Sequence, residues 1–261
     1  MSWFTSHSGH VQSGSNSLSG PVPERTEFSQ TTLHLRGPLP WGGDSDDPGG
    51  NNPLSFNLLI PRVEIDQLKV ASGQRLSLQG LGDVSAYVEG QTNDNWGWLA
   101  GMKFPTGDEA QRPGPGLVPP SLLQLGSGTF DPIFGLRYLQ DDGGQLVKFA
   151  SGLLIFPIDE SDGGLRAGRT LRFNAGGYWR TGQWWNPSMQ LEALKRDPDR
   201  LDSSTLSDTG ATLWTLIPAL TANLGASSFV QVSWRLPLTQ DVNGTQLVPG
   251  TGFTIEGGIR F

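Results

Sequence analysis

Apolar and polar residues alternate along the last eleven residues of the chain, 251–261. One side of this segment carries Phe253, Ile255, Gly257, Ile259 and Phe261, and the residues between them are polar or glycine. A period of two places successive side chains on opposite faces of a β-strand. The pattern therefore predicts a strand with one apolar and one polar face.

Similar segments recur along the rest of the chain. The clearest span residues 83–89, 96–104, 131–138, 170–180, 186–193 and 229–236, and earlier candidates span 29–36 and 54–60. Two more segments, 146–156 and 212–222, are apolar on both faces, so their orientation is less clear. With the C-terminal strand this gives eleven strands, and the chain is predicted to be all-β.

The linkers between these segments alternate between long and short. Long linkers lie near 105–127, 158–167, 196–208 and 238–250, and short ones near 91–95, 140–144, 181–184 and 223–227. Transmembrane barrels have this rhythm, because their periplasmic turns are short and their extracellular loops are long. We therefore expect a transmembrane antiparallel up-and-down β-barrel. Its extracellular loops would be these long linkers and one more near 62–81.

The number of strands follows from the position of the chain ends. Both ends of such a barrel normally lie in the periplasm, which requires an even number of strands. We expect about twelve, with the barrel over residues 29–261 and a first strand within 1–28. Ten is the alternative, in which 1–28 is a periplasmic extension and 29–36 forms a plug or extension.

Charged residues keep to the polar faces of these segments. They are Glu89, Lys103, Asp131, Arg137, Lys148, Arg172, Arg180, Glu192, Arg235, Glu256 and Arg260, of which Lys148 lies on one of the less clear strands. An Arg or Lys costs about 2–4 kcal/mol at the lipid face at mid-depth. These side chains are therefore predicted to face the lumen. They either fill it as mutual ion pairs or line a narrow polar pore.

Composition is consistent with a barrel and excludes several other classes. The chain has 36 Gly in 261 residues and no long apolar run, so a spanning helix is not expected. It has no cysteine, which excludes disulfides and thiolate metal sites. The net charge of −7 disfavours nucleic-acid binding. The first residues show no positive segment followed by an apolar one, so no signal peptide is recognised, although an outer-membrane protein requires one.

Catalytic chemistry is not indicated by the sequence. The three histidines, His7, His10 and His34, all lie near the start, and none lies on a convincing outward strand position near a partner serine. The acidic run at Asp44, Asp46 and Asp47 lacks the spacing of a calcium loop. We therefore expect no enzyme activity, no metal and no cofactor.

Four short motifs resemble a known family. Residues 59–61 (Leu-Ile-Pro), 80–84 (Gly-Leu-Gly-Asp-Val), 103–107 (Lys-Phe-Pro-Thr-Gly) and 126–129 (Gly-Ser-Gly-Thr) occur in this order. The set resembles the putative outer-membrane transporters named for the MetA pathway of phenol degradation. The resemblance covers about residues 60–135 and implies a barrel channel for small hydrophobic or aromatic compounds. Physically, we interpret the motifs as punctuation at the barrel rim, with glycines for turns and Pro105 as a strand end.

The C-terminal strand also resembles the closing strand of bacterial outer-membrane barrels, which commonly ends in Phe. The resemblance implies that Phe253, Ile255, Ile259 and Phe261 form a signal for the barrel-assembly machinery in the bacterial outer membrane. The predicted function is passive passage of small solutes. One alternative is a filled barrel that acts as a scaffold or sleeve for an unknown protein partner. A second is a soluble β-sandwich binding module.

Overall fold

The computed structural model describes residues 2–8, 10–17, 24–39, 54–69, 74–108, 124–182, 184–225 and 227–259. The acidic run near 44–47 and two residues of the C-terminal prediction, Arg260 and Phe261, lie outside these ranges. Within them no helix is long and apolar enough to cross a membrane.

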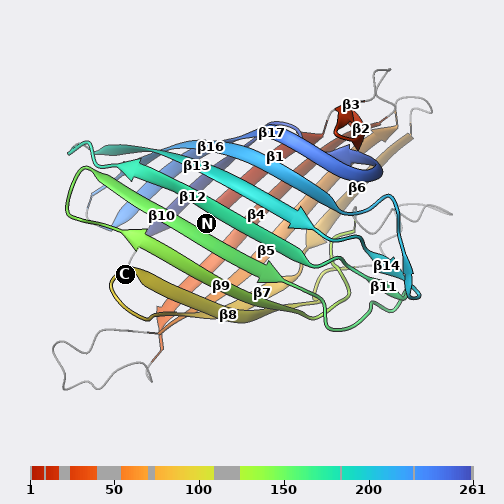
Figure 1. Cartoon of the computed structure of the whole chain (residues 1–261), viewed down its shortest axis with the longest axis horizontal. Helices are drawn as coiled ribbons and strands as arrows, with labels where there is room; N and C mark the ends of the chain where they lie inside the picture. The colour runs from red at the N-terminus through yellow and green to blue at the C-terminus, as the bar shows by residue number, and fades with distance from the viewer. Residues whose placement is uncertain are drawn as a thin grey trace.

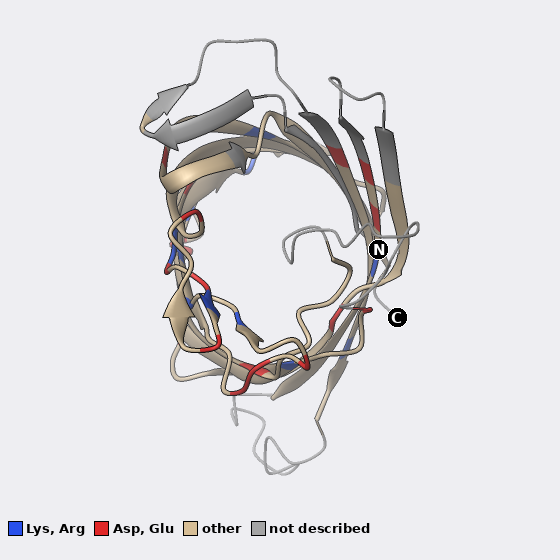
Figure 2. Cartoon of the chain, turned by 90° about the vertical axis from the view of Figure 1, so that its right-hand side faces the viewer, with Lys and Arg blue, Asp and Glu red and all other residues tan. Residues whose placement is uncertain are grey.

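Twelve antiparallel strands form one ring in the described part of the chain. Their order is β16-β13-β12-β10-β9-β8-β7-β5-β4-β1-β18-β17, and β17 pairs in turn with β16. Each strand of the ring therefore has a ring partner on both sides, and the ring has no free edge. Figure 1 shows the strands crossing the molecule obliquely, and Figure 2 shows the ring from one end. The all-β prediction with about twelve strands is confirmed.

The ring strands are long enough to cross a bilayer. They are β1 Ser2–Ser8, β4 Glu24–Pro38, β5 Ser55–Lys69, β7 Val84–Gln91, β8 Trp96–Phe104, β9 Asp131–Gln140, β10 Leu146–Ile155, β12 Thr170–Trp179, β13 Trp185–Arg196, β16 Ala211–Asn223, β17 Ser228–Val248 and β18 Gly252–Ile259. Most have eight or more residues, and a tilted membrane strand needs about 9–11. The strand within residues 1–28 is β1, which closes the ring between β4 and β18.

Most short and long connections lie at opposite ends of the ring. Four short ones, which join β7 to β8, β9 to β10, β12 to β13 and β16 to β17, lie at one end. We call this the short-turn end, and the opposite end the long-loop end. Two connections depart from this rule, since the long one from β4 to β5 lies at the same end as these turns and the one from the extended β17 to β18 has only residues 249–251. Strand β18 runs toward the short-turn end, since Ile259 pairs with Ser228, which follows a short turn.

Two segments expected as loops are strands instead. Strand β5 continues to Lys69 and pairs with β6 (Gln74–Leu81), so much of the stretch 62–81 forms a hairpin beyond the rim. Strand β17 continues to Val248 and pairs with β16 and with β2 (His10–Gly14), which in turn pairs with β3 (Asn16–Ser17). These extensions form because each finds a neighbouring strand that also passes the rim.

The outer face of the ring is an apolar belt bounded by aromatic residues. Its exposed members include Leu33, Leu35, Phe134, Leu136, Leu171, Phe173, Met189, Leu191 and Ile255. Trp96, Trp179 and Trp184 are exposed near the short-turn end, and Phe104, Phe130, Trp214 and Trp234 toward the other end. A lipid-facing band flanked by aromatic girdles has this composition, whereas a face in water would be more polar.

Candidate functional site

The inner face of the ring carries the polar side chains, and strand register identifies it. Residues paired directly across neighbouring strands share a face, so Ser85, Lys103 and Asp131 lie on one side. The exposed Phe134 and Leu171, which both pair with Leu154, lie on the other. In a barrel, interior and exterior residues alternate along every strand. The polar set is therefore the interior one.

Two ion pairs reach across an intervening strand, which is favoured on the concave side of a curved sheet because side chains converge there. Arg36 on β4 contacts Glu89 on β7 at 3.0 Å, across β5. Arg235 on β17 bonds Glu192 on β13, across β16. Glu192 also faces Arg172 on β12 at 3.6 Å. These contacts independently place the five charged residues inside the barrel.

The motifs at 80–84, 103–107 and 126–129 meet in one buried cluster at the long-loop end. The Asp83 carboxylate accepts hydrogen bonds from the Ser127 amide (2.8 Å) and hydroxyl (2.7 Å) and from the Gly107 amide (3.1 Å). The Lys103 ammonium lies 3.3 Å from Asp83 and 2.5 Å from Asp131, and it donates to the Ser127 hydroxyl at 2.7 Å. Thr129 donates to Asp131 at 2.7 Å. We call Asp83, Lys103, Ser127, Thr129 and Asp131 the clamp.

The clamp holds the end of the long loop against the inner wall. Leu125 packs with Val63, Ile65 and Leu78, in the described hairpin of β5 and β6. Val63 and Ile65 lie an even number of residues from Asn57 on the same strand, so all three share a face. Asn57 pairs with Tyr87, which faces inward, and Val63 and Ile65 therefore face inward too. Residues 124–129 therefore turn inward at the rim, where they narrow this end of the barrel.

Four of the motif glycines, Gly80, Gly82, Gly107 and Gly126, serve this close approach, whereas Gly128 has a positive φ of 68° and serves a turn. Gly82 and Gly107 have no positive φ, so a tight turn does not explain them. A Cβ at Gly126 would overlap the Gly107 carbonyl oxygen, and one at Gly80 would lie 2.7 Å from Leu125 Cδ1. The interpretation of these motifs as turn punctuation is therefore incomplete, because they form an internal ion-paired contact.

The wall away from the clamp mixes hydrogen-bonded amides with apolar side chains. The Gln190 amide donates to Asn174 Oδ1 at 2.9 Å, and Asn174 donates to the Ser151 hydroxyl at 3.4 Å. Leu139 and Phe149 pair across β9 and β10 on the same inner face, and Leu139 remains 39% exposed. This part of the interior is amphipathic.

The residues predicted to face the lumen divide into four groups, of which Lys148 forms the last. Glu89, Lys103, Asp131, Arg137, Arg172, Glu192, Arg235 and Glu256 lie on the inner face by register or contact. Arg180 follows the end of β12 and binds Asp141 in the neighbouring short turn. Arg260 lies outside the described residues.

Lys148 lies on the outer face instead of the lumen. It pairs with Gln140 and Gly177, in line with the exposed Leu136 and Leu146. Strand β10 is apolar on both faces, because its inner residues include Val147 and Phe149. Alternation therefore could not assign a side. Lys148 is near the short-turn end, where a lysine can extend toward headgroups.

Several interior residues had no signal in the local pattern. Arg36 lies on a strand whose pattern does not indicate a face, and Ser127 and Thr129 lie just outside strands. Their roles depend on contacts across 44 residues of sequence, such as Ser127 with Asp83. Only the co-occurrence of the motifs could have indicated this cluster.

In the described ranges, no three or more His, Asp or Glu side chains gather closely enough to hold a metal ion. His34 Nε2 lies 2.9 Å from the Asn57 amide oxygen on the inner wall, which is a structural contact.

Comparison with known proteins gives the fold. No protein-family description and no curated sequence matches the chain. Among solved structures, an outer-membrane channel from Pseudomonas putida F1 is similar over 100% of this chain and 93% of its own, with a TM-score of 0.80 and 13% identity. The β domain of the Bordetella autotransporter BrkA is similar over 100% of this chain and 98% of its own, with a TM-score of 0.60 and 10% identity. The transport unit of the autotransporter AIDA-I from Escherichia coli is similar over 100% of this chain and 89% of its own, with a TM-score of 0.54 and 10% identity. The chain has the fold of outer-membrane β-barrels.

Proposed function

We propose that this protein is a channel of the bacterial outer membrane that passes small solutes by diffusion. The observation that carries the proposal is an inner face that water can reach within a closed ring. The Arg172 side chain is 41% exposed although it faces inward, and Arg137 and Leu139 are also exposed there. A barrel packed solid with side chains would bury these residues.

The charges of the interior favour uncharged solutes. The ion pairs of the inner wall contain four cationic and four anionic residues, so their charges cancel. Rings of one charge sign are what select ions in pores. A balanced wall with apolar patches at Leu139 and Phe149 suits small hydrophobic or aromatic molecules. This is the class implied by the resemblance to the phenol-pathway transporters.

The membrane placement follows from the outer face. We propose that the belt contacts outer-membrane lipid and that the long-loop end faces the exterior. Phe253, Ile255 and Ile259 pair in line with the outer residues of β17, such as Trp234. They are proposed to form, with Phe261, the signal for the barrel-assembly machinery.

Single-channel recording in a planar bilayer tests the proposal. We expect steady openings from the purified protein and a reduced ion current when a small phenolic solute enters the pore. Insertion without current would support the second candidate, a filled barrel that acts as a scaffold. That candidate is favoured by the clamp, which narrows one end. Failure of the protein to insert into the bilayer would contradict both candidates, the channel and the scaffold.

A further inference from the structure

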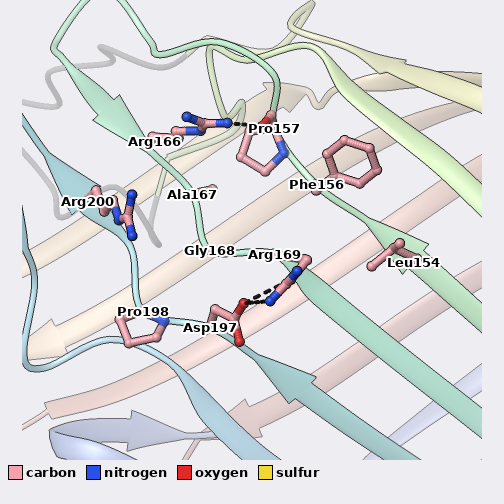
Figure 3. Close-up of a pocket in the computed structure, with 10 residues that line it drawn as sticks. All are labelled: Leu154, Phe156, Pro157, Arg166, Ala167, Gly168, Arg169, Asp197, Pro198 and Arg200. Carbon is pink, nitrogen blue, oxygen red and sulfur yellow. Dashed lines mark hydrogen bonds and ion pairs between the residues drawn. The ribbon is translucent and has the colours of Figure 1, made fainter. Parts of the chain in front are cut away.

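A cavity of about 440 Å³ lies at the long-loop end, outside the features described so far. It is formed by the connection from β10 to β12 and the connection from β13 to β16, and Figure 3 shows its lining. Three arginines, Arg166, Arg169 and Arg200, contribute to it together with Leu154 and Phe156. The cavity is therefore basic on one side and apolar on the other.

Two of these arginines are direct cross-strand neighbours. Arg166 on β11 (Leu165–Arg166) pairs with Arg200 on β14 (Arg200–Leu201). Like charges directly opposite each other on a sheet are destabilising. Arg166 donates to the Pro157 carbonyl at 3.0 Å, and among the described residues neither arginine has an acidic partner. Arg169 differs, because it is paired with Asp197 at 2.9 Å. The pair Arg166 and Arg200 thus presents two positive charges that an anion would balance.

The loops that carry this pair are held in place by buried contacts. The Asp199 carboxylate accepts hydrogen bonds from the Gly168 amide and from Arg196, both at 2.7 Å. The Asp199 amide donates to the Thr209 hydroxyl at 2.8 Å. Gly168 is required here, since a Cβ would overlap the Asp197 carbonyl oxygen. The two arginines are therefore displayed by a built structure and not by loose loops.

The apolar side of the cavity is continuous with the outer belt. Leu154 pairs with Phe134 and Leu171, which are both exposed on the outer face. The Phe156 ring stacks on Phe134 with centroids 6.2 Å apart. A ligand whose anionic group lies between Arg166 and Arg200 would extend its apolar part along this belt. A small free anion has no apolar part and cannot make this contact.

We propose that this cavity binds the phosphate group of a membrane lipid in the leaflet at the long-loop end. The inference rests on the proposed membrane placement, but it does not require that the barrel conducts. Arginine forks suit phosphate oxygens, and basic pockets beside an apolar surface bind anionic headgroups. The acyl chains lie against Leu154, Phe156 and Phe134. The bound lipid joins the two loops that carry the arginine pair.

Native mass spectrometry of the detergent-purified barrel tests this, with phosphatidic acid as the probe. Diacylglycerol serves as the uncharged control, and glycerol 3-phosphate and inorganic phosphate as soluble controls. We expect phosphatidic acid to bind and diacylglycerol not to. Arg166→Gln and Arg200→Gln should each weaken binding roughly tenfold, as expected for loss of one charge-assisted hydrogen bond. Arg180→Gln, at the short-turn end, should bind as wild type does.

The possible outcomes separate this site from the barrel's proposed role. Heat-modifiable migration and insertion into vesicles show first that each variant is folded, and Arg200→Lys should retain most of the binding. Unchanged phosphatidic acid binding by Arg166→Gln/Arg200→Gln would overturn the site. Equally tight binding of glycerol 3-phosphate or inorganic phosphate would overturn the lipid as its ligand. A wild-type protein that never inserts would refute the proposed function, whereas one that inserts and conducts without binding phosphatidic acid refutes only this inference.

Discussion

Replacing Lys103 with methionine should destabilise the barrel strongly through the clamp. The Lys103 ammonium is the cation between two carboxylates, and the side chains of Asp83 and Asp131 are only 8% and 5% exposed. Methionine keeps much of the side-chain length and volume, so packing changes little. The substitution leaves two buried negative charges without their cation.

The expected magnitude follows from this burial. Breaking a buried ion pair by removing one partner costs roughly 3–5 kcal/mol. Because the Lys103 side chain is 23% exposed, water can partly replace it, and we expect about 3 kcal/mol, the lower end of that range. Without Lys103, Ser127 keeps its two hydrogen bonds to Asp83 but loses the ammonium group that also contacts Asp131. The end of the long loop should then be held less tightly against the inner wall.

Reversible urea unfolding in lipid vesicles, followed by tryptophan fluorescence, measures the change in free energy of unfolding. Lys103→Met/Asp131→Asn should recover part of the loss, since it removes one of the uncompensated charges. Arg180→Gln breaks an exposed pair and should have a much smaller effect than Lys103→Met. A loss below about 1 kcal/mol for Lys103→Met, or no recovery in the double variant, would refute the reasoning.

Three further predictions concern the two faces, the loop and a short turn. Ala175→Arg on the outer face should cost about 2–4 kcal/mol by the same unfolding assay, whereas Asn174→Arg on the inner face should cost far less; equal costs would reverse the assigned facing. Gly126→Ala should loosen the end of the loop, seen as faster proteolysis after residue 108, and unchanged cleavage would contradict the close contact. The hydrogen bond from Arg180 lowers the pKa of Asp141 below its ordinary value, so this pair stabilises the fold above that value and the effect is lost as pH falls through the folded-state pKa. Arg180→Gln should raise the pKa of Asp141 in a carboxyl NMR titration, and an unchanged value would exclude this cause.

The strands could be predicted because a barrel imposes period-two alternation wherever one face meets lipid and the other water. Residues 170–180 and 229–236 have this pattern, and both form ring strands. Alternation predicts the facing of side chains less well on strands whose inner face is itself apolar. Val147 and Phe149 face inward, so β10 has no polar stripe, and Lys148 was assigned to the lumen although it lies outside.

The clamp could not be predicted from local pattern, because its residues are distant in sequence. Ser127 and Thr129 both lie beyond strand ends, where alternation gives no facing. For Arg180 the alternation was misleading, because it continues the polar face of β12 and so predicts a lumen residue. The strand ends at Trp179, and Arg180 binds Asp141 in the neighbouring short turn. The sequence motifs contain most of the clamp residues, but only the folded ring shows which of these residues contact one another.

The central claim is that the ring spans a membrane around a wet interior, and labelling of single cysteines along β12 tests it most directly. The chain has no cysteine, so each introduced thiol is the only reactive one. In vesicles, a water-soluble thiol reagent should label residues 172 and 174 and leave 171, 173 and 175 unreacted. Uniform labelling would contradict a membrane-spanning strand, and uniform protection would contradict a water-filled interior.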